Sequence, residues 1–235
     1  MLTDRQNQLL KTIVRQYIET AQPVCSEWLA ENFKLDKKKI SPATIRNEMS
    51  VLLDKGFLSQ PHTSAGRVPT EKAYHYYIKN FVNPNDLEQR QIKQIEKFKN
   101  KTGESMAKEL SQMMAELTGE LAIVALDKNN FYYTGFSNLF SQPEFSQSSQ
   151  EIYGLGQIFD RLDNIVGQVF DQVEDEPQVL LGRDNPFGDL CSTILTRIDL
   201  PNQKDGVVFG LLGPLRMDYS QNLALINYVK KMLNN

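Results

Sequence analysis

The sequence predicts an α+β protein: an N-terminal winged helix-turn-helix, a helical linker, and a C-terminal mixed, largely antiparallel sheet with helices on one side. Three observations lead to this prediction. A capped helix with a polar outer face is indicated at 41–54, a hairpin carrying Arg67 follows it, and strand-like and helical segments alternate after residue 120. We expect the domains at residues 1–82, 83–120 and 121–235.

The first two helices of the head have recognisable start and stop signals. Thr3 and Gln6 fit a capping box, in which each side chain accepts a hydrogen bond from the other's free backbone N–H. Pro23 forbids continuation of the first helix, and Ser26 is expected to cap a short second helix. The predicted inward residues are Leu9, Leu10, Ile13, Val14, Tyr17, Ile18, Leu29 and Phe33. A charged, polar connection, 34–39, leads to the third helix.

The third helix separates into a buried face and an outer face. Ser41 is its expected N-cap, Pro42 occupies the first turn, where a missing N–H costs nothing, and Gly56 is suited to ending it. The residues expected to face inward are Ile45, Met49, Leu52 and Leu53. Those left facing outward are Ala43, Thr44, Arg46, Asn47 and Ser50.

The outer face has the side chains that a major-groove reader needs. Arginine can contact guanine and asparagine can contact adenine through two hydrogen bonds each, while small residues allow close approach. The hairpin after this helix would add contacts to the DNA backbone, with Arg67 the main candidate and His62 equally well explained as a surface residue. The candidate DNA-binding residues are Ser26, Ser41, Ala43, Thr44, Arg46, Asn47, Ser50, His62, Thr63, Ser64, Gly66 and Arg67. The alternative is that these polar residues only solvate a surface helix.

Charge and composition agree with this interpretation and argue against several others. Residues 1–83 contain 12 Lys/Arg and 8 Asp/Glu, whereas residues 84–235 contain 14 and 21, so a basic head precedes an acidic body.

Cys25 and Cys191 lie too far apart in sequence to resemble a metal site, and we expect no cofactor. Both histidines lie in or beside the head, so the body lacks a histidine base and no enzyme is expected. Without a signal peptide or membrane-spanning run, the chain is expected to be cytoplasmic.

The body alternates helical and strand-like segments. Aromatic residues at 74–81 follow one helical face and are expected to pack on the head. One helical stretch is expected at about 86–117, weakened by Gly103. A hairpin of 121–126 and 131–136, a helix near 149–170, strands at 178–181, 190–198 and 206–212, and a closing helix at 218–233 complete the prediction.

Several segments of the chain closely resemble the HrcA family of heat-inducible transcription repressors. They are Met1–Gln6, Ala21–Val24, Ser41–Met49, Gln60–Pro69, Gly135–Phe140, Pro143–Phe145 and Leu212–Tyr219. The resemblance implies a winged helix and a GAF-like α+β domain. It also implies a repressor that binds an inverted-repeat operator on double-stranded DNA upstream of chaperone operons, with the chaperonin as a modulator.

The chain departs from the family at one place. Family members usually carry an inserted dimerisation module within the GAF-like domain, whereas here Leu121–Asp127 leads through Lys128–Asn130 directly into Phe131. A short hairpin is therefore expected in place of the insert. Because a palindromic operator matches a two-fold dimer, we expect a homodimer formed through the linker helix or the C-terminal sheet.

Two other functions are compatible with the same sequence. The GAF-like domain could bind a small effector and regulate the winged helix, which would require a sizeable apolar pocket. The chain could also be a protein-interaction adaptor whose winged helix does not bind DNA.

Overall fold

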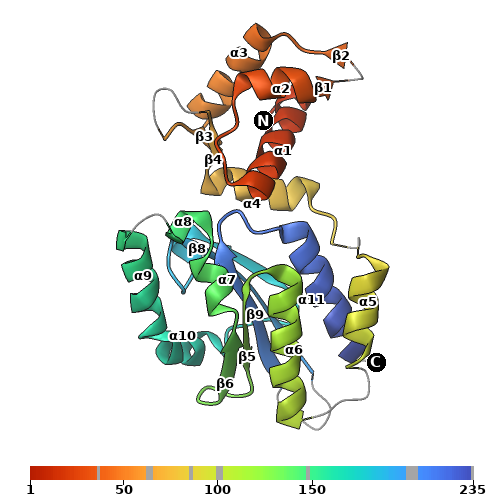
Figure 1. The fold of residues 1–235 in the computed structure, drawn as a ribbon, viewed down its shortest axis with the longest axis vertical. Coiled ribbons are helices and arrows are strands. Elements are labelled where there is room, and N and C mark those ends of the chain that lie inside the picture. Colours follow the sequence, from red (N-terminus) through yellow and green to blue (C-terminus); the bar gives the residue numbers. More distant parts are fainter. Residues whose placement is uncertain are drawn as a thin grey trace. The chain divides into compact units, whose positions relative to one another are not determined.

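In the computed structural model the chain forms two units, Met1–Val82 and Asn83–Asn235 (Figure 1). The structure describes residues 1–35, 38–61, 66–84, 87–98, 103–146, 149–199 and 206–233. The expected α+β architecture, with an N-terminal winged helix and a C-terminal sheet, is confirmed. No helix within these ranges is long and apolar enough to cross a membrane.

The first unit is a helix-turn-helix followed by a wing. Its helices and strands are α1 (Asp4–Thr20), α2 (Ser26–Asn32), β1 (Lys34–Leu35), β2 (Lys38–Lys39), α3 (Pro42–Asp54), β3 (Leu58–Ser59), β4 (Val68–Pro69) and α4 (Glu71–Phe81). The capping box of Thr3 and Gln6 is present at the start of α1. Tyr74 and Tyr77 of α4 are buried, and the phenol of Tyr77 accepts a hydrogen bond from Arg15 of α1, as expected for packing within the head.

Two details of the head differ from the sequence prediction. Cys25, not Ser26, is the N-cap of α2, and Ser26 is its first helical residue. The cap has no side-chain hydrogen bond to the helix, so the start of α2 is fixed by packing around buried Val24 and Leu29 rather than by cap chemistry. The polar connection before α3 contains a short antiparallel pair, β1 with β2.

The second unit is built on a five-stranded sheet. Its strands are β5 (Leu121–Ala125), β6 (Phe131–Thr134), β7 (Gln178–Leu181), β8 (Cys191–Ile198) and β9 (Val207–Pro214), in the order β6-β5-β9-β8-β7. Every neighbouring pair is antiparallel, so the mixed sheet allowed by the sequence is not observed. The β5–β6 hairpin forms as expected, with Ala125 opposite Phe131.

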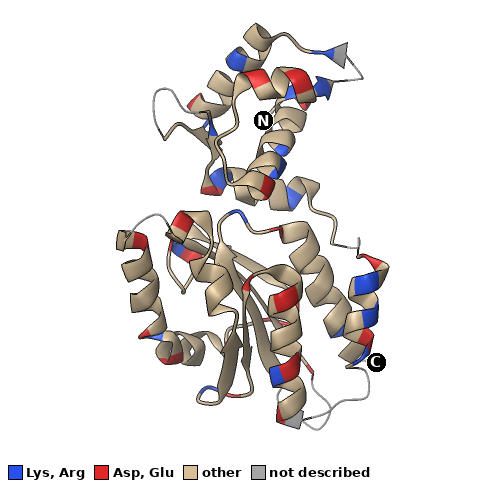
Figure 2. Cartoon of the chain, in the orientation of Figure 1, with Lys and Arg blue, Asp and Glu red and all other residues tan. Residues whose placement is uncertain are grey.

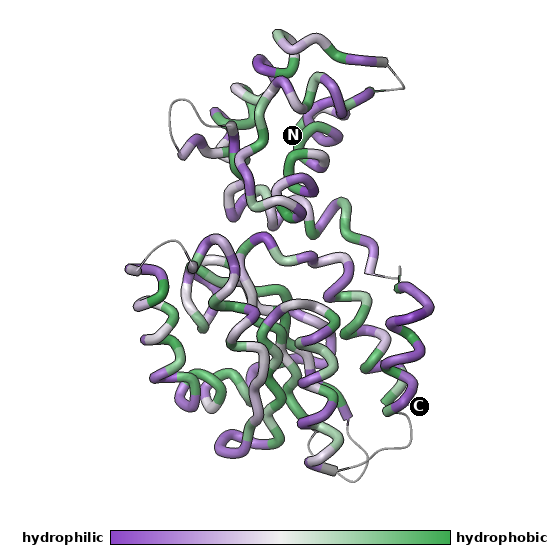
Figure 3. Tube along the Cα trace, in the orientation of Figure 1, coloured by the Kyte–Doolittle hydropathy of each residue, from purple (hydrophilic) through white to green (hydrophobic). Residues whose placement is uncertain are grey.

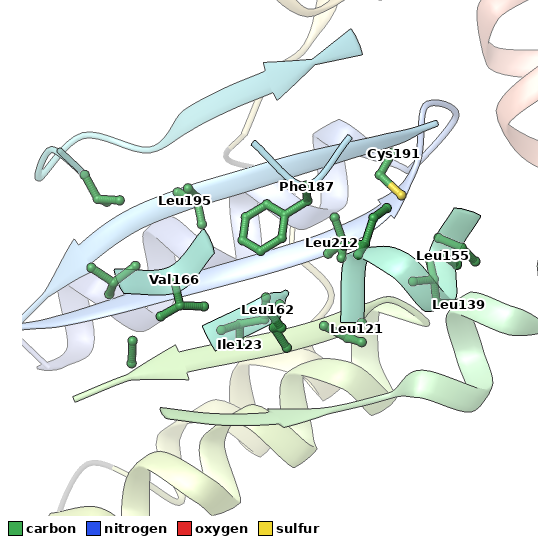
Figure 4. Packing of buried hydrophobic residues seen from close by; sticks show 14 of the residues in the cluster. Leu121, Ile123, Leu139, Leu155, Leu162, Val166, Phe187, Cys191, Leu195 and Leu212 are labelled. Atoms are coloured by element: carbon green, nitrogen blue, oxygen red, sulfur yellow. The ribbon is translucent and has the colours of Figure 1, made fainter. Parts of the chain in front are cut away.

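Helices cover both faces of this sheet, and the expectation of helices on one side was wrong. All residues of the central strands β5 and β9 are buried, which requires a cover on each face. On one face, Leu162 and Val166 of α10 join Ile123 and Leu195 in a large apolar cluster (Figure 4). Figure 3 shows the strands as largely hydrophobic. The helices of the unit are α5 (Gln89–Glu96), α6 (Gly103–Thr118), α7 (Phe136–Phe140), α8 (Pro143–Ser146), α9 (Ser149–Phe159), α10 (Leu162–Val169) and α11 (Tyr219–Leu233), with a 3-10 turn at Gly182–Asp184.

The two long helical stretches expected in the body are each divided. The first becomes α5 and α6, with Gly103 as the first residue of α6 rather than a weak point within a continuous helix. The second becomes α9 and α10, separated at Asp160–Arg161. In α6, Met106, Leu110 and Met113 are buried. These side chains are used inside the unit and are not available to a coiled-coil partner.

Candidate nucleic-acid interface

The start of α3 is fixed by its own side chains. The hydroxyl of Ser41 accepts a hydrogen bond from the backbone N–H of Thr44 at 3.2 Å, and the two hydroxyls lie 2.9 Å apart. Pro42 follows the cap, as predicted. This arrangement leaves the first turn of α3 ordered at the surface, where its free N–H groups can meet an anion.

The two faces of α3 are divided as the periodicity predicts. Ile45, Met49 and Leu52 are buried, while Leu53 is only half-buried. The exposed candidates are Ser41, Ala43, Arg46, Asn47 and Ser50, with Thr44 half-buried. The structure therefore brings these candidates together on one outward face.

Arg46 has an acidic neighbour that the sequence analysis missed. Its Nη2 lies 3.7 Å from Oε1 of Glu27 in α2, and the two side chains are 62% and 67% exposed. The pKa of Glu27 is lowered, first by a hydrogen bond to its own backbone, then by the Ser26 hydroxyl, and further by the charge of Arg46. Glu27 is therefore an ionised carboxylate beside the guanidinium of Arg46. The Ser26 hydroxyl, at the start of α2, helps to lower the pKa of this carboxylate.

A second set of polar contacts connects α1 to α3 and orients the outer face. Glu48 accepts hydrogen bonds from Arg5 at 3.2 Å and from Gln6 at 3.0 Å. Gln6 in turn accepts a bond from the ammonium group of Lys55 at 3.1 Å. Since Glu48 follows Asn47 directly, these contacts fix the rotation of α3 about its axis.

The base of the wing pairs with the chain segment just before α2. Val24 and Arg67 form a two-residue bridge, with N–H to carbonyl distances of 2.9 and 2.8 Å. A Cβ on Gly66 would lie 2.5 Å from the carbonyl carbon and oxygen of Val24, so this position needs glycine for close backbone approach. The side chain of Arg67 is half-buried and its Nε is enclosed by protein. The candidates His62, Thr63 and Ser64 lie outside the described residues.

The second unit contains a buried acid, Glu120, and a buried thiol, Cys191. Burial raises the pKa of Glu120 to about 8, opposed by Arg216 and Asn222 and reinforced by Glu144 and Asp218. A Cβ on Gly213 would overlap this carboxyl, so glycine makes the room for it. Within the described ranges, no group of three His, Cys, Asp or Glu side chains could hold a metal ion.

A helix-turn-helix whose third helix exposes arginine and asparagine, with a wing bridged to the segment before α2, defines a winged-helix domain of the DNA-binding type. Residues 1–81 match a family model described as "Winged helix-turn-helix transcription repressor, HrcA DNA-binding". Residues 69–222 match "HrcA protein C terminal domain". The chain therefore belongs to the HrcA family, which is a family of transcription repressors and not of enzymes.

Named relatives agree with this assignment, and a solved structure shares the fold. Proteins named "Heat-inducible transcription repressor HrcA" from Brevibacillus brevis and Acaryochloris marina are 42% and 43% identical over 127 and 129 residues. Each match covers 53% of this chain but only 36% and 34% of the relative, so the matched part spans about a third of their length. A crystal structure of a hypothetical protein superposes with a TM-score of 0.71 over 99% of this chain and 96% of the other, at 18% identity, which shows a shared fold.

Proposed function

We propose that this chain is a sequence-specific DNA-binding repressor of heat-inducible chaperone genes that binds an inverted-repeat operator as a homodimer. The observation that carries the proposal is the outer face of α3, where Arg46 and Asn47 are exposed beside the small residues Ala43 and Ser50. Repression would follow from occupancy of promoter DNA in the cytoplasm and would need no chemical step.

The contacts divide into two kinds. Arg46 and Asn47 are proposed to read base edges in the major groove, where each can form paired hydrogen bonds to one base. Ser26, Ser41 and Thr44, near the starts of α2 and α3, are proposed to meet phosphates, as is Arg67 in the wing. Ala43, Ser50 and Gly66 would allow close approach, and His62, Thr63 and Ser64 would extend the wing contact.

Selection from a pool of random 30-base-pair duplexes tests this proposal whatever the sequence of the operator. We expect the wild-type protein to enrich an inverted repeat. Arg46→Ala should lose discrimination between the enriched and a scrambled duplex, by roughly tenfold or more for one lost bidentate contact. Arg67→Ala should weaken both duplexes to a similar extent. Lys79→Ala, on the exposed side of α4, is the control and should change neither. Failure of the wild-type protein to enrich any sequence would contradict the proposal.

The dimer and the chaperonin are the proposed partners. A two-fold protein matches a palindromic operator, with half-sites about one helical turn apart. Sedimentation at micromolar concentration, with and without the enriched duplex, should show a dimer in at least one condition. A monomer in both would contradict it. Adding chaperonin to the binding assay should raise the active fraction of repressor.

A second candidate function is regulation by a small effector. A partly open hollow of about 340 Å³ is lined by residues of the sheet, α10 and the 3-10 turn, among them Val169, Leu180, Leu195, Gln178 and Arg183. This volume lies at the small end of ligand sites in proteins. A metabolite that raises the melting temperature and changes duplex affinity would support the candidate, because ligand binding stabilises the folded form. Melting temperatures unchanged across a metabolite panel would argue against it.

A further inference from the structure

Helix α5 exposes a basic stripe. Arg90, Lys93 and Lys97 are all exposed, and their spacing of three and four residues places them on one side of the helix. With Gln89 and Gln94 they line a shallow, open hollow of about 570 Å³ on the surface. The opposite side is held in the protein, because Ile95 and Phe98 are buried. The blue segments of α5 in Figure 2 mark this stripe.

Two acids among the described residues flank the stripe, and each has a local hydrogen-bond partner. Glu96, three residues after Lys93, accepts a hydrogen bond from the phenol of Tyr228 in α11, at 3.2 Å. Glu88 is the N-cap of α5 and forms a capping box with Gln91. Residues 88–98 therefore contain three cations against two carboxylates, which leaves the stripe with a positive balance for an external anion.

The charge of this segment contrasts with the rest of the body. Residues 89–101 contain five Lys/Arg and one Asp/Glu, whereas residues 102–235 contain nine Lys/Arg and eighteen Asp/Glu. Most of the body would be repelled by a polyanion, and the basic segment follows directly after the DNA-binding unit.

We propose that the α5 stripe, formed by Arg90, Lys93 and Lys97, is a second, sequence-independent binding surface for the phosphate backbone of duplex DNA. This inference rests on the proposed function, because the duplex is the one bound by α3 and the wing. Lysine and arginine that neutralise phosphates release counterions, which raises affinity for any sequence.

The length of the connecting chain makes the contact feasible. From Phe81, the last residue of α4, to Gln89, the first of α5, there are eight steps along the chain. Eight residues span at most about 28 Å when fully extended, and one turn of duplex is about 34 Å long. The connecting chain is therefore shorter, even when fully extended, than one turn of the duplex.

An anionic membrane is the less favoured partner. A helix that binds a membrane surface inserts its apolar side among the lipids. In α5 that side, with Ile95, is already packed inside the protein. Only the charged side is free, which suits a rigid, highly charged surface such as DNA.

The test is the salt dependence of duplex binding by the Arg90→Gln/Lys93→Gln/Lys97→Gln variant. Affinity for the selected duplex and for a scrambled one is measured by fluorescence anisotropy between 50 and 300 mM KCl. Each lost phosphate contact should reduce the slope of log K against log salt by about 0.9, so we expect a reduction of about 2.7 for both duplexes. The ratio between the two affinities should stay unchanged.

The matched control is Lys108→Gln/Lys128→Gln/Arg161→Gln, which removes the same charge from exposed positions elsewhere in the body. Its slope should equal that of the wild type. The inference would be overturned if the α5 variant kept the wild-type slope, or if the control lost as much slope as the α5 variant. It would also be overturned if the α5 variant lost binding to anionic vesicles while its slopes for both duplexes stayed at the wild-type value. The single variant Lys93→Gln, expected to lose about 0.9, keeps the test valid if the triple variant is unstable. Wild-type protein that binds no duplex would overturn the proposed function itself.

Discussion

Arg46 of α3 and Glu27 of α2 form an exposed ion pair, with 3.7 Å between Nη2 and Oε1. The arginine proposed to read bases therefore lies beside a carboxylate before any DNA arrives. A phosphate or base edge has to compete with this partner, so Glu27 should reduce non-specific attraction and leave discrimination to the base contact.

Glu27→Gln is expected to raise affinity for a scrambled duplex by roughly two- to fivefold, the range typical of an exposed charge pair. The selected duplex should gain less, so the affinity ratio should fall. Glu31→Gln, also exposed in α2, is the control and should have a smaller effect. Equal gains from both substitutions would mean that only net charge matters.

The stability of the second unit should depend on Glu120. Its folded-state pKa is about 8, against a reference value of 4.5. The folded state keeps this proton up to about pH 8, whereas the unfolded chain releases it near pH 4.5, so the free energy of unfolding should fall as pH rises between these values. Glu120→Gln should remove this decline and stabilise the unit at pH 8, on the order of a few kcal/mol.

Urea unfolding of wild type and Glu120→Gln at intervals from pH 5 to 8.5 checks this expectation. The difference between the two proteins should widen with pH. A constant difference across the range would show that Glu120 is already ionised in the folded protein.

The two thiols should differ in reactivity. Cys25 is exposed and Cys191 is buried, and burial raises the pKa of Cys191 to about 12. A disulfide reagent at pH 8 should modify one thiol rapidly in the folded protein and a second only on unfolding. Cys25→Ser should abolish the rapid phase, and the selected duplex should slow it because Cys25 caps α2 beside Glu27. Rapid loss of both thiols would contradict the burial of Cys191.

Substitution of Gly66 should disturb the contact between the wing and the backbone of Val24. Gly66→Ala introduces a Cβ 2.5 Å from the Val24 backbone, and relief of such overlap typically costs about 1–3 kcal/mol of stability. Affinity for selected and scrambled duplexes should fall together. Gly156→Ala in α9, where a Cβ would meet nothing within 4 Å, should be neutral or stabilise by up to about 1 kcal/mol. Thermal melts and anisotropy compare the two variants, and equal effects would contradict the Gly66 prediction.

The sequence predicted α3 and the wing because their signals are local. Ile45, Met49 and Leu52 follow one helical period, and the cap at Ser41 lies next to Pro42. The pair of Arg46 and Glu27 was missed because it depends on how α2 crosses α3, which no local pattern encodes. Side-chain roles in DNA contact stay predictions.

The errors in the body have physical causes too. Leu121–Ala125 is an unbroken apolar run, which is typical of a strand buried on both faces, and this signal was available for predicting helices on each side of the sheet. Gly135 is the N-cap of the short helix α7, and its φ of 95° is one that glycine adopts readily. Its place is set by close approach to the backbone of Glu120, because a Cβ here would lie 2.5 Å from the Glu120 carbonyl oxygen. That contact lies fifteen residues away in sequence and leaves no periodic trace.

The turn between β5 and β6 carries its own hydrogen bonds. Leu126 N–H donates to the carbonyl of Asn130 at 2.8 Å, and the Asp127 carboxylate accepts from the N–H groups of Asn129 and Asn130. The strands on either side stay paired through their own ladder, and the chain enters and leaves the turn at neighbouring positions. Exposed turns with close ends tolerate added chain at a small entropic cost. A fluorescent reporter domain could therefore be inserted between Lys128 and Asn129 while the sheet keeps its strand order.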